Sequence, residues 1–310
     1  MITLATLQSG LTQGLLWAIL TLGVYISFRI LDFADLTVEG SFPLGAAVCV
    51  VLINRGVNPF LATIAAMAAG TLAGLCTGFL HTFFKIPGIL SGILTMISLY
   101  SVNIRIMHDK ATVAIAGDSL KTFAVKLFPA GTDSNLVSGV VGLIVCTAMI
   151  GLLYYFFGTE IGCAIRATGG SAPMARAMGV RTNAMIVLGL AVSNALVALS
   201  GSLIAQFDYG SALVNMGQGT IVIGLASVII GEVLFLHRDR NFAFKMTAVS
   251  LGAVIYRTVI ACALTLRGLK ATDLKMITAV IVAIALAVPV LKEKWVLLRR
   301  RMAKRRENHA

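Results

Sequence analysis

The stretch "LDFADLTVEGSFPLGAA" (Leu31–Ala47) places three acidic side chains and a proline between two long apolar runs. Asp32, Asp35, Glu39 and Pro43 all fall within twelve residues. A charged side chain costs free energy inside a bilayer, and proline interrupts a helix. How the chain accommodates these acids at the mouth of an apolar segment therefore decides the fold.

The surrounding composition is that of a membrane protein. The 310 residues are 58% hydrophobic and only 12% charged, and the mean hydropathy is +0.93. Soluble domains carry about 25% charged residues. The apolar runs have the length of about 20 residues that a helix needs to cross the hydrocarbon core.

We therefore expect an all-α polytopic membrane protein with about nine transmembrane helices. The expected spans are 9–28, 40–54, 59–81, 88–107, 136–157, 184–205, 219–235, 246–266 and 274–291. The second and seventh are short and interrupted by glycine, which is typical of broken helices.

The basic residues predict the orientation, because cytoplasmic loops are enriched in Lys and Arg. Eight of the 25 basic residues lie in 292–310, a basic tail that we place inside. The connection 158–183 is then also inside, and the nearly charge-balanced segment 105–135 is outside, with an amphipathic helix expected over 118–128. Residues 1–291 form one transmembrane domain, with the N-terminus outside and the C-terminus inside.

Two glycine motifs echo each other across the chain. Gly40-SFPL-Gly45 follows "DFAD", and Gly219-TIVI-Gly224 follows "QFDYG". The orientation makes the first motif enter from inside and the second from outside, as in inverted repeats around a central pathway. The candidate pathway residues are Asp32, Phe33, Asp35, Glu39, Gly40, Phe42, Pro43, Gly45, Phe207, Asp208, Gly219, Gly224 and Arg257.

Two interpretations remain open for the charged members of this set. The acids of Leu31–Ala47 either cap a helix N-terminus or line a wet pathway. Arg257, near the middle of a span, needs a partner, for which Glu232 and Asp208 are the candidates. It forms either a structural ion pair or subunit contact, or part of the pathway where it meets a substrate carboxylate.

The inner connection 158–183 is longer than the join of two neighbouring helices requires. Within it, "APMARAMG" (Ala172–Gly179) predicts a short helix with Pro173 in its first turn and Gly179 at its C-terminal cap. Its apolar side carries Met174. An exposed short helix with an apolar side predicts a partner groove.

No motif for catalysis or metal binding accompanies these features. The sequence contains no G-x4-G-K-[ST], H-E-x-x-H or G-x-S-x-G pattern, and its five cysteines are scattered. We expect no catalytic residue and no metal site in this chain. If ATP drives its function, another subunit must hydrolyse it.

The stretch "RATGGSAPMARAMGV" resembles the coupling loop of permease subunits in the branched-chain amino-acid and sugar branch of ABC importers. "DFADLTVEGSFPLGAA" and "ASVIIGEVLF" (Ala226–Phe235) are similar to two further segments of that family. The resemblance covers nearly the whole chain and is strongest to the permeases of tryptophan/tyrosine uptake systems.

The resemblance implies a type II-like ABC importer permease in the plasma (inner) membrane of a prokaryote. Its partners would be a second permease copy, two ATP-binding subunits carrying ATP and Mg on the cytoplasmic side, and an external substrate-binding protein; nucleic acid is not expected. The residues implied in coupling to the ATPase are Arg166, Thr168, Gly169, Met174, Ala175, Arg176 and Gly179.

We therefore expect a transport subunit, not an enzyme, that moves an amino acid, and specifically an aromatic one, by alternating access. The alternatives are an ion-coupled secondary transporter, which would not need the docking helix, or an ABC permease for a nucleoside or sugar. An intramembrane enzyme would need convergent His, Cys or carboxylate groups, and the four histidines are far apart in the sequence.

Overall fold

The computed structural model describes residues 4–129, 133–235 and 241–264, with a few positions between 276 and 287. Seven helices in this part are long and apolar enough to cross a membrane, and an eighth, Val38–Asn54, is shorter. These eight correspond to the first eight expected spans. The ninth, 274–291, and the tail 292–310 lie outside the described residues, apart from those few positions.

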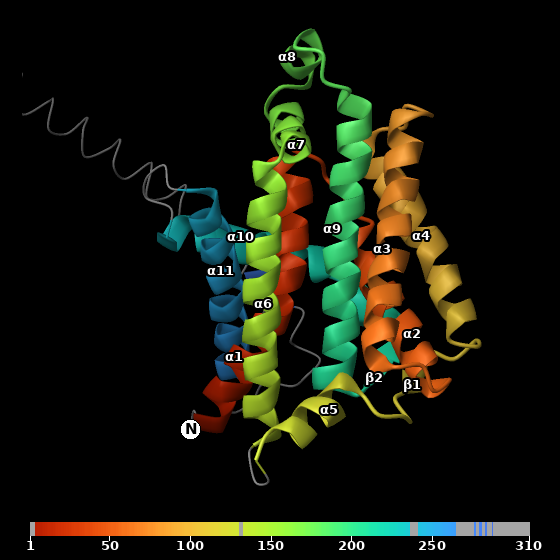
Figure 1. The fold of residues 1–310 in the computed structure, drawn as a ribbon, viewed down its shortest axis with the longest axis vertical. Helices are drawn as coiled ribbons and strands as arrows, with labels where there is room; N and C mark the ends of the chain where they lie inside the picture. Colours follow the sequence, from red (N-terminus) through yellow and green to blue (C-terminus); the bar gives the residue numbers. More distant parts are fainter. Residues whose placement is uncertain are drawn as a thin grey trace, which may run out of the picture.

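The helices form one bundle with their connections at two ends (Figure 1). In chain order the elements are α1 (Leu4–Tyr25), η1 (Ile26–Ile30), α2 (Val38–Asn54), α3 (Pro59–Thr82), α4 (Gly88–Ile106), β1 (Thr112–Ala114), α5 (Leu120–Leu127), α6 (Ser134–Gly158), α7 (Glu160–Gly170), α8 (Ala172–Ala177), α9 (Thr182–Ile204), η2 (Ala205–Tyr209), β2 (Ser211–Leu213), η3 (Val214–Gly217), α10 (Thr220–Phe235) and α11 (Phe242–Leu264). Figure 1 shows α7 and α8 at one end and α5, β1 and β2 at the other.

The expected helical membrane fold is confirmed, with one short strand pair that the sequence did not predict. Strands β1 and β2 pair antiparallel, with Thr112 opposite Leu213 and Ala114 opposite Ser211. Each strand has three residues, too few for a period-two pattern to appear in the sequence. The pair joins two connections at the end of the bundle opposite α8.

The structure repeats one order of elements. Long helix α1 ends in the π-helical segment η1 and is followed by short α2 and long α3, while α9, η2, α10 and α11 follow the same order. The two π-helical segments begin 179 residues apart, and so do Gly40 and Gly219. The repeat of the glycine motifs in the sequence therefore also includes the π-helical segments that precede each motif.

Helices of the first repeat pack against helices of the second: α3 lies against α9, and α1 lies against α11. Glycines make these crossings close. A Cβ on Gly74 of α3 would collide with the carbonyl oxygen of Leu190, and one on Gly14 of α1 would lie 2.6 Å from the Cα of Val254. Helices in a bilayer associate through such close backbone contacts, because lipid provides little hydrophobic drive between them.

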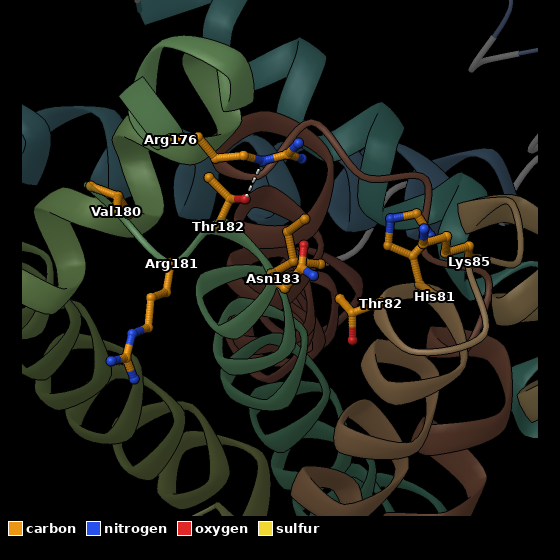
Figure 2. A pocket seen from close by; sticks show the side chains of 9 residues that line it. His81, Thr82, Lys85, Arg176, Val180, Arg181, Thr182 and Asn183 are labelled. Carbon is orange, nitrogen blue, oxygen red and sulfur yellow. Dashed lines mark hydrogen bonds between the residues drawn. The ribbon is translucent and has the colours of Figure 1, made fainter. Parts of the chain in front are cut away.

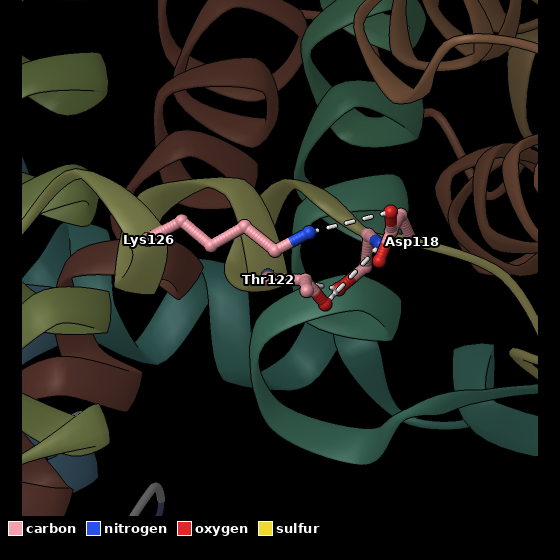
Figure 3. A network of polar contacts seen from close by, with 4 residues as sticks. Asp118, Thr122 and Lys126 are labelled. Carbon is pink, nitrogen blue, oxygen red and sulfur yellow. Dashed lines mark hydrogen bonds and ion pairs between the residues drawn. The ribbon is translucent and has the colours of Figure 1, made fainter.

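Helix α5 forms within the amphipathic segment expected at 118–128 (Figure 3). Ser119 caps it with a capping box to Thr122, and Asp118 pairs with Lys126 at 3.5 Å. The Leu120 amide donates to Gln206 Oε1 over 2.9 Å, so the helix is bound to η2 at the end of the bundle.

We expect Gly74→Ala to destabilise the protein, because the added methyl meets the backbone of α9 and not a movable side chain. Overpacking of this kind costs about 1–3 kcal/mol. The measurement is the melting temperature of the purified protein in detergent. Gly151→Ala on α6 is the matched control, since a Cβ there meets nothing within 4 Å. Equal melting of the two variants would contradict the packing described.

Candidate functional site

The two glycine motifs meet where α2 and α10 begin. Glu39, in the first turn of α2, accepts a hydrogen bond at Oε1 from the Gly219 amide over 3.0 Å. A Cβ on Gly217 would lie 2.7 Å from Pro43 Cδ and would collide with the Glu39 carbonyl oxygen. Gly219 has φ +80°, a conformation that glycine adopts without strain. The structure therefore brings Glu39, Gly40, Pro43 and Gly219 together.

A cavity of about 470 Å³ opens beside this contact. It lies between the first turns of α2, the second half of α4 and the segment around η3. Its lining residues are Glu39, Gly40, Pro43, Met96, Ile97, Tyr100, Asn103, Val214, Asn215 and Gln218. The arrangement combines one carboxylate and several amides with an apolar wall, which is typical of a small-molecule site.

Asp35 is enclosed in a separate polar cluster. Its Oδ1 accepts from the Thr37 amide over 2.9 Å, and its Oδ2 accepts from Asn194 Nδ2 over 2.7 Å. Ser41 donates to Asn194 Oδ1 over 2.6 Å, and the Thr37 and Thr77 hydroxyls lie 2.6 Å apart. All five side chains are buried. The cluster joins the start of α2 to α3 and α9.

Asp32 and Phe33 lie elsewhere, at the end of the bundle that carries α7 and α8. They line a cavity of about 490 Å³ together with Thr168 and Gly169. The Phe33 ring meets the His81 ring edge-on, with centroids 5.0 Å apart. Of the acids in the opening stretch, only Glu39 lines the cavity between α2 and α4.

Arg257 lies over the ring of Trp17, with its guanidinium carbon 3.6 Å from the ring centroid. Asp208 and Tyr209 interact with it electrostatically, and Gln13 donates to Asp208 over 3.1 Å. Of the two candidate partners, Asp208 is therefore the one that interacts with Arg257, whereas Glu232 pairs with Arg29 at 2.8 Å. Arg257 therefore belongs to a cluster beside η2, near the end of the bundle that carries α5.

The remaining predicted pathway residues pack in the interior. The Phe42 ring lies tilted against the Trp17 ring with centroids 5.2 Å apart, and Phe207 is buried. Gly45 meets the backbone of Ala198, and Gly224 meets the side chain of Val24. These residues hold α2 and α10 in place and do not line the cavity beside Glu39.

The predicted coupling residues lie on α7, α8 and the turn after α8. Met174 is 69% exposed, whereas Thr168 and Ala175 are buried. Gly179, at φ +85°, ends the short helix, and Arg166 stacks over the Phe242 ring at 5.0 Å. A Cβ on Gly169 would lie 2.9 Å from the Leu31 Cα, so α7 packs directly on the backbone that follows η1.

Arg176 fixes α8 to the start of α9 (Figure 2), because its Nε donates to Thr182 Oγ1 over 2.8 Å. The two residues border a cavity of about 660 Å³. Its other lining residues are His81, Thr82, Lys85, Val180, Arg181, Asn183 and Ile186. This end of the bundle is rich in basic side chains, as expected of a cytoplasmic face.

Sequence reasoning missed Asn103 and Asn194, which lie in apolar helices and are both buried. Their signal is weak, because a single amide leaves the apolar character of a span unchanged. The rule that a polar group inside a membrane needs a partner could have identified them as candidates for tertiary contacts. Among the described residues, no group of three or more His, Cys, Asp or Glu side chains could hold a metal ion.

Comparison with known proteins identifies the family of this chain. The model of the family described as branched-chain amino acid transport system / permease component matches residues 6–288. A tyrosine transport system permease protein of Clostridioides difficile (strain R20291) is 40% identical over 279 residues, 90% of each chain. A fructose import permease protein, FruG, of Bifidobacterium longum (strain NCC 2705) is 30% identical over 64% of this chain and 59% of its own.

A solved structure, PsaBC from Streptococcus pneumoniae in complex with Fab, covers 90% of this chain and 89% of its own, at 14% identity and a TM-score of 0.49. The family match spans nearly the whole chain. The chain therefore belongs to the branched-chain amino acid transport system / permease component family, the multi-pass membrane permeases of bacterial ABC importers, which hydrolyse no ATP themselves and work with ATPase and binding-protein partners.

Proposed function

We propose that this permease carries an aromatic amino acid, tyrosine or tryptophan, into the cell. The observation that carries the proposal is the 40% identity to a tyrosine transport system permease over 90% of both chains. The cavity beside Glu39 supports it, because its lining combines a carboxylate and amides with the larger side chains of Met96, Ile97 and Tyr100. An amino acid with an apolar ring needs both kinds of surface.

In this proposal two copies of the permease form the passage in the plasma membrane. Two ATPase subunits, which bind ATP and Mg, dock on the inside, and a binding protein delivers substrate outside. The N-terminus is outside, the C-terminus is inside, and 274–291 forms the ninth span. The two π-helical segments begin 179 residues apart, and the helices of each repeat pack against those of the other. Both observations support an inverted repeat of type II-like architecture.

Coupling to the ATPase proceeds through α8 and α7. Met174 on α8 and Met178 directly after it are exposed and provide an apolar surface for a groove on the ATPase. Arg176 holds this helix to α9 through Thr182. The close contact of Gly169 with the backbone of Leu31 then transmits displacement of α7 to the segment that leads into α2.

Transport proceeds by alternating access and needs no covalent chemistry in this chain. The binding protein releases substrate at the outer face, and ATP-driven closure of the ATPases moves α7 and α8. Because α2 and α10 both begin at the Glu39–Gly219 contact, displacement of α2 changes the cavity there. The passage then opens to the inside.

A second candidate substrate is a sugar, which the 30% identity to the fructose import permease favours. That relative covers a smaller part of this chain than the tyrosine permease does. A nucleoside permease is the remaining alternative within the family. The ion-coupled carrier considered from the sequence does not agree with membership of an ABC importer family.

The test of the proposed substrate is reconstitution in proteoliposomes with the ATPase and binding protein encoded beside this gene. Uptake of radiolabelled tyrosine, tryptophan, leucine, fructose and adenosine is measured with ATP inside. We expect tyrosine or tryptophan uptake to exceed that of the other three. Preferential uptake of fructose or adenosine would overturn the proposal.

The coupling route predicts a large effect of Gly169→Ala, because the methyl would press on the backbone that follows η1. We expect uptake per ATP hydrolysed to fall several-fold. Gly170→Ala is the matched control, since a Cβ on this neighbouring glycine meets nothing within 4 Å. Both variants are assayed for ATP hydrolysis and uptake in the same vesicles, and an unchanged ratio in Gly169→Ala would contradict the route.

A further inference from the structure

We propose that Glu39 and Asn103 recognise the α-amino group of the transported amino acid, as a defined ammonium site in the cavity between α2, α4 and η3. The inference rests on the proposed amino-acid substrate and adds to it the chemical group that the permease recognises. It assigns the specificity to the acceptor groups of two residues, one acidic and one neutral, that line the same cavity.

The first observation is the orientation of Asn103 on α4. Its Nδ2 donates to the Gly40 carbonyl oxygen over 3.2 Å, and a carbonyl accepts only from the amide nitrogen. The neighbouring contact thereby determines which atom is Oδ1. The side chain is 1% exposed, and Oδ1 has no hydrogen-bond partner among the residues that the structure describes. A buried amide oxygen without a donor is rare in folded proteins.

The second observation is the charge of Glu39. Its Oε1 accepts one hydrogen bond, from the Gly219 amide, while an ionised carboxylate has about four lone-pair sites. In the described part of the chain, the ion pairs within 4.0 Å are those of Arg29 with Glu232 and of Lys126 with Asp118. An ionised Glu39 would therefore have no basic partner among the described residues, next to a cavity.

These two acceptors lie on neighbouring elements and are linked through one residue. Asn103 is bonded to the carbonyl of Gly40, and Gly40 follows Glu39 in the chain. A donor with several N–H bonds and a positive charge would satisfy both acceptors and balance the charge of an ionised Glu39. A primary ammonium, with three donors, has that chemistry.

The rest of the cavity suits the remainder of an amino acid. Its volume of about 470 Å³ lies within the range of about 300–1,000 Å³ typical of small-molecule sites. Pro43, Met96, Ile97 and Tyr100 form an apolar wall for a side chain, and the Asn215 amide can donate to a carboxylate. A metal ion such as Mg²⁺ would require a closed shell of oxygen ligands, which this apolar wall does not provide.

Asp35 shows the contrast with a structural carboxylate. Both of its oxygens accept hydrogen bonds, from the Thr37 amide and from Asn194. It is fully buried and borders none of the cavities described above. Glu39 differs in both respects, which is why the ammonium site is assigned to Glu39 and not to its neighbour.

The test uses the purified permease in nanodiscs with its ATPase and without the binding protein, so that the permease itself is probed. The probes are radiolabelled tyrosine, tyramine, which retains the ammonium, and 3-(4-hydroxyphenyl)propionate, which retains the carboxylate. Binding to wild type is compared with Glu39→Gln, Asn103→Leu and the control Asp118→Asn. The glutamine retains an acceptor for the Gly219 amide, and the control makes the same exchange at an exposed carboxylate.

We expect tyrosine and tyramine to bind wild type and Asp118→Asn, and Glu39→Gln to weaken both by about tenfold, the loss expected for one charge-assisted hydrogen bond. Asn103→Leu weakens both as well, and the propionate binds none of them well. The melting temperature and the ATP hydrolysis of each variant establish that it is folded and assembled.

Unchanged tyramine binding in folded Glu39→Gln, or equal binding of the propionate, would overturn the site. Loss of tyramine binding when sodium chloride replaces choline chloride at equal ionic strength would also overturn the site, because it would identify a metal-cation site. The proposed substrate is tested separately by uptake. Vesicles that take up neither tyrosine nor tryptophan, while the permease still binds tyramine through Glu39, would reject the substrate and support the ammonium site.

Discussion

Two helices of this protein begin inside the bundle, and their free backbone amides must find acceptors there because lipid supplies none. The acids of the opening stretch supply them. Asp35 accepts from the Thr37 amide at the start of α2, and Glu39 accepts from the Gly219 amide just before α10. Each carboxylate thus belongs to a helix start, one its own and one from the other half of the chain. The rest of the bundle is arranged around this contact.

Much of the arrangement was predictable because it depends on local patterns. The apolar lengths predicted the first eight spans, but the broken helices expected at Gly40-x4-Gly45 and Gly219-x4-Gly224 are wrong, because α2 is continuous through Gly40 and Gly45 and α10 is continuous through Gly224. Proline and glycine correctly predicted the short helix α8. Each of these signals reports a backbone constraint that acts within a few residues, so it is visible without knowledge of the tertiary contacts.

The contacts that complete the site were not predictable for the opposite reason. Asn194 reaches Asp35 across 159 residues of sequence, and Asn103 reaches Gly40 across 63. Glu232 and Arg257 lie on successive spans, yet Glu232 pairs with Arg29 and Arg257 lies on Trp17. Sequence proximity favours a neighbour, while helix orientation places the two side chains near opposite ends of the bundle. The three-dimensional arrangement of the helices therefore determines which side chain pairs with a buried charged residue.

In the proposed mechanism, one short segment connects the helix that contacts the ATPase with the residues that recognise the substrate. Helix α7 presses through Gly169 on the backbone after η1, and five residues beyond Ile30 the chain reaches Asp35. The cluster around Asp35 secures the first turn of α2 to α3 and α9, and that turn carries Glu39. A displacement at the inner face therefore cannot reach α2 without acting on the residues that face the cavity. In the proposed mechanism, Glu39 would contact the substrate and would lie on the segment whose movement releases it.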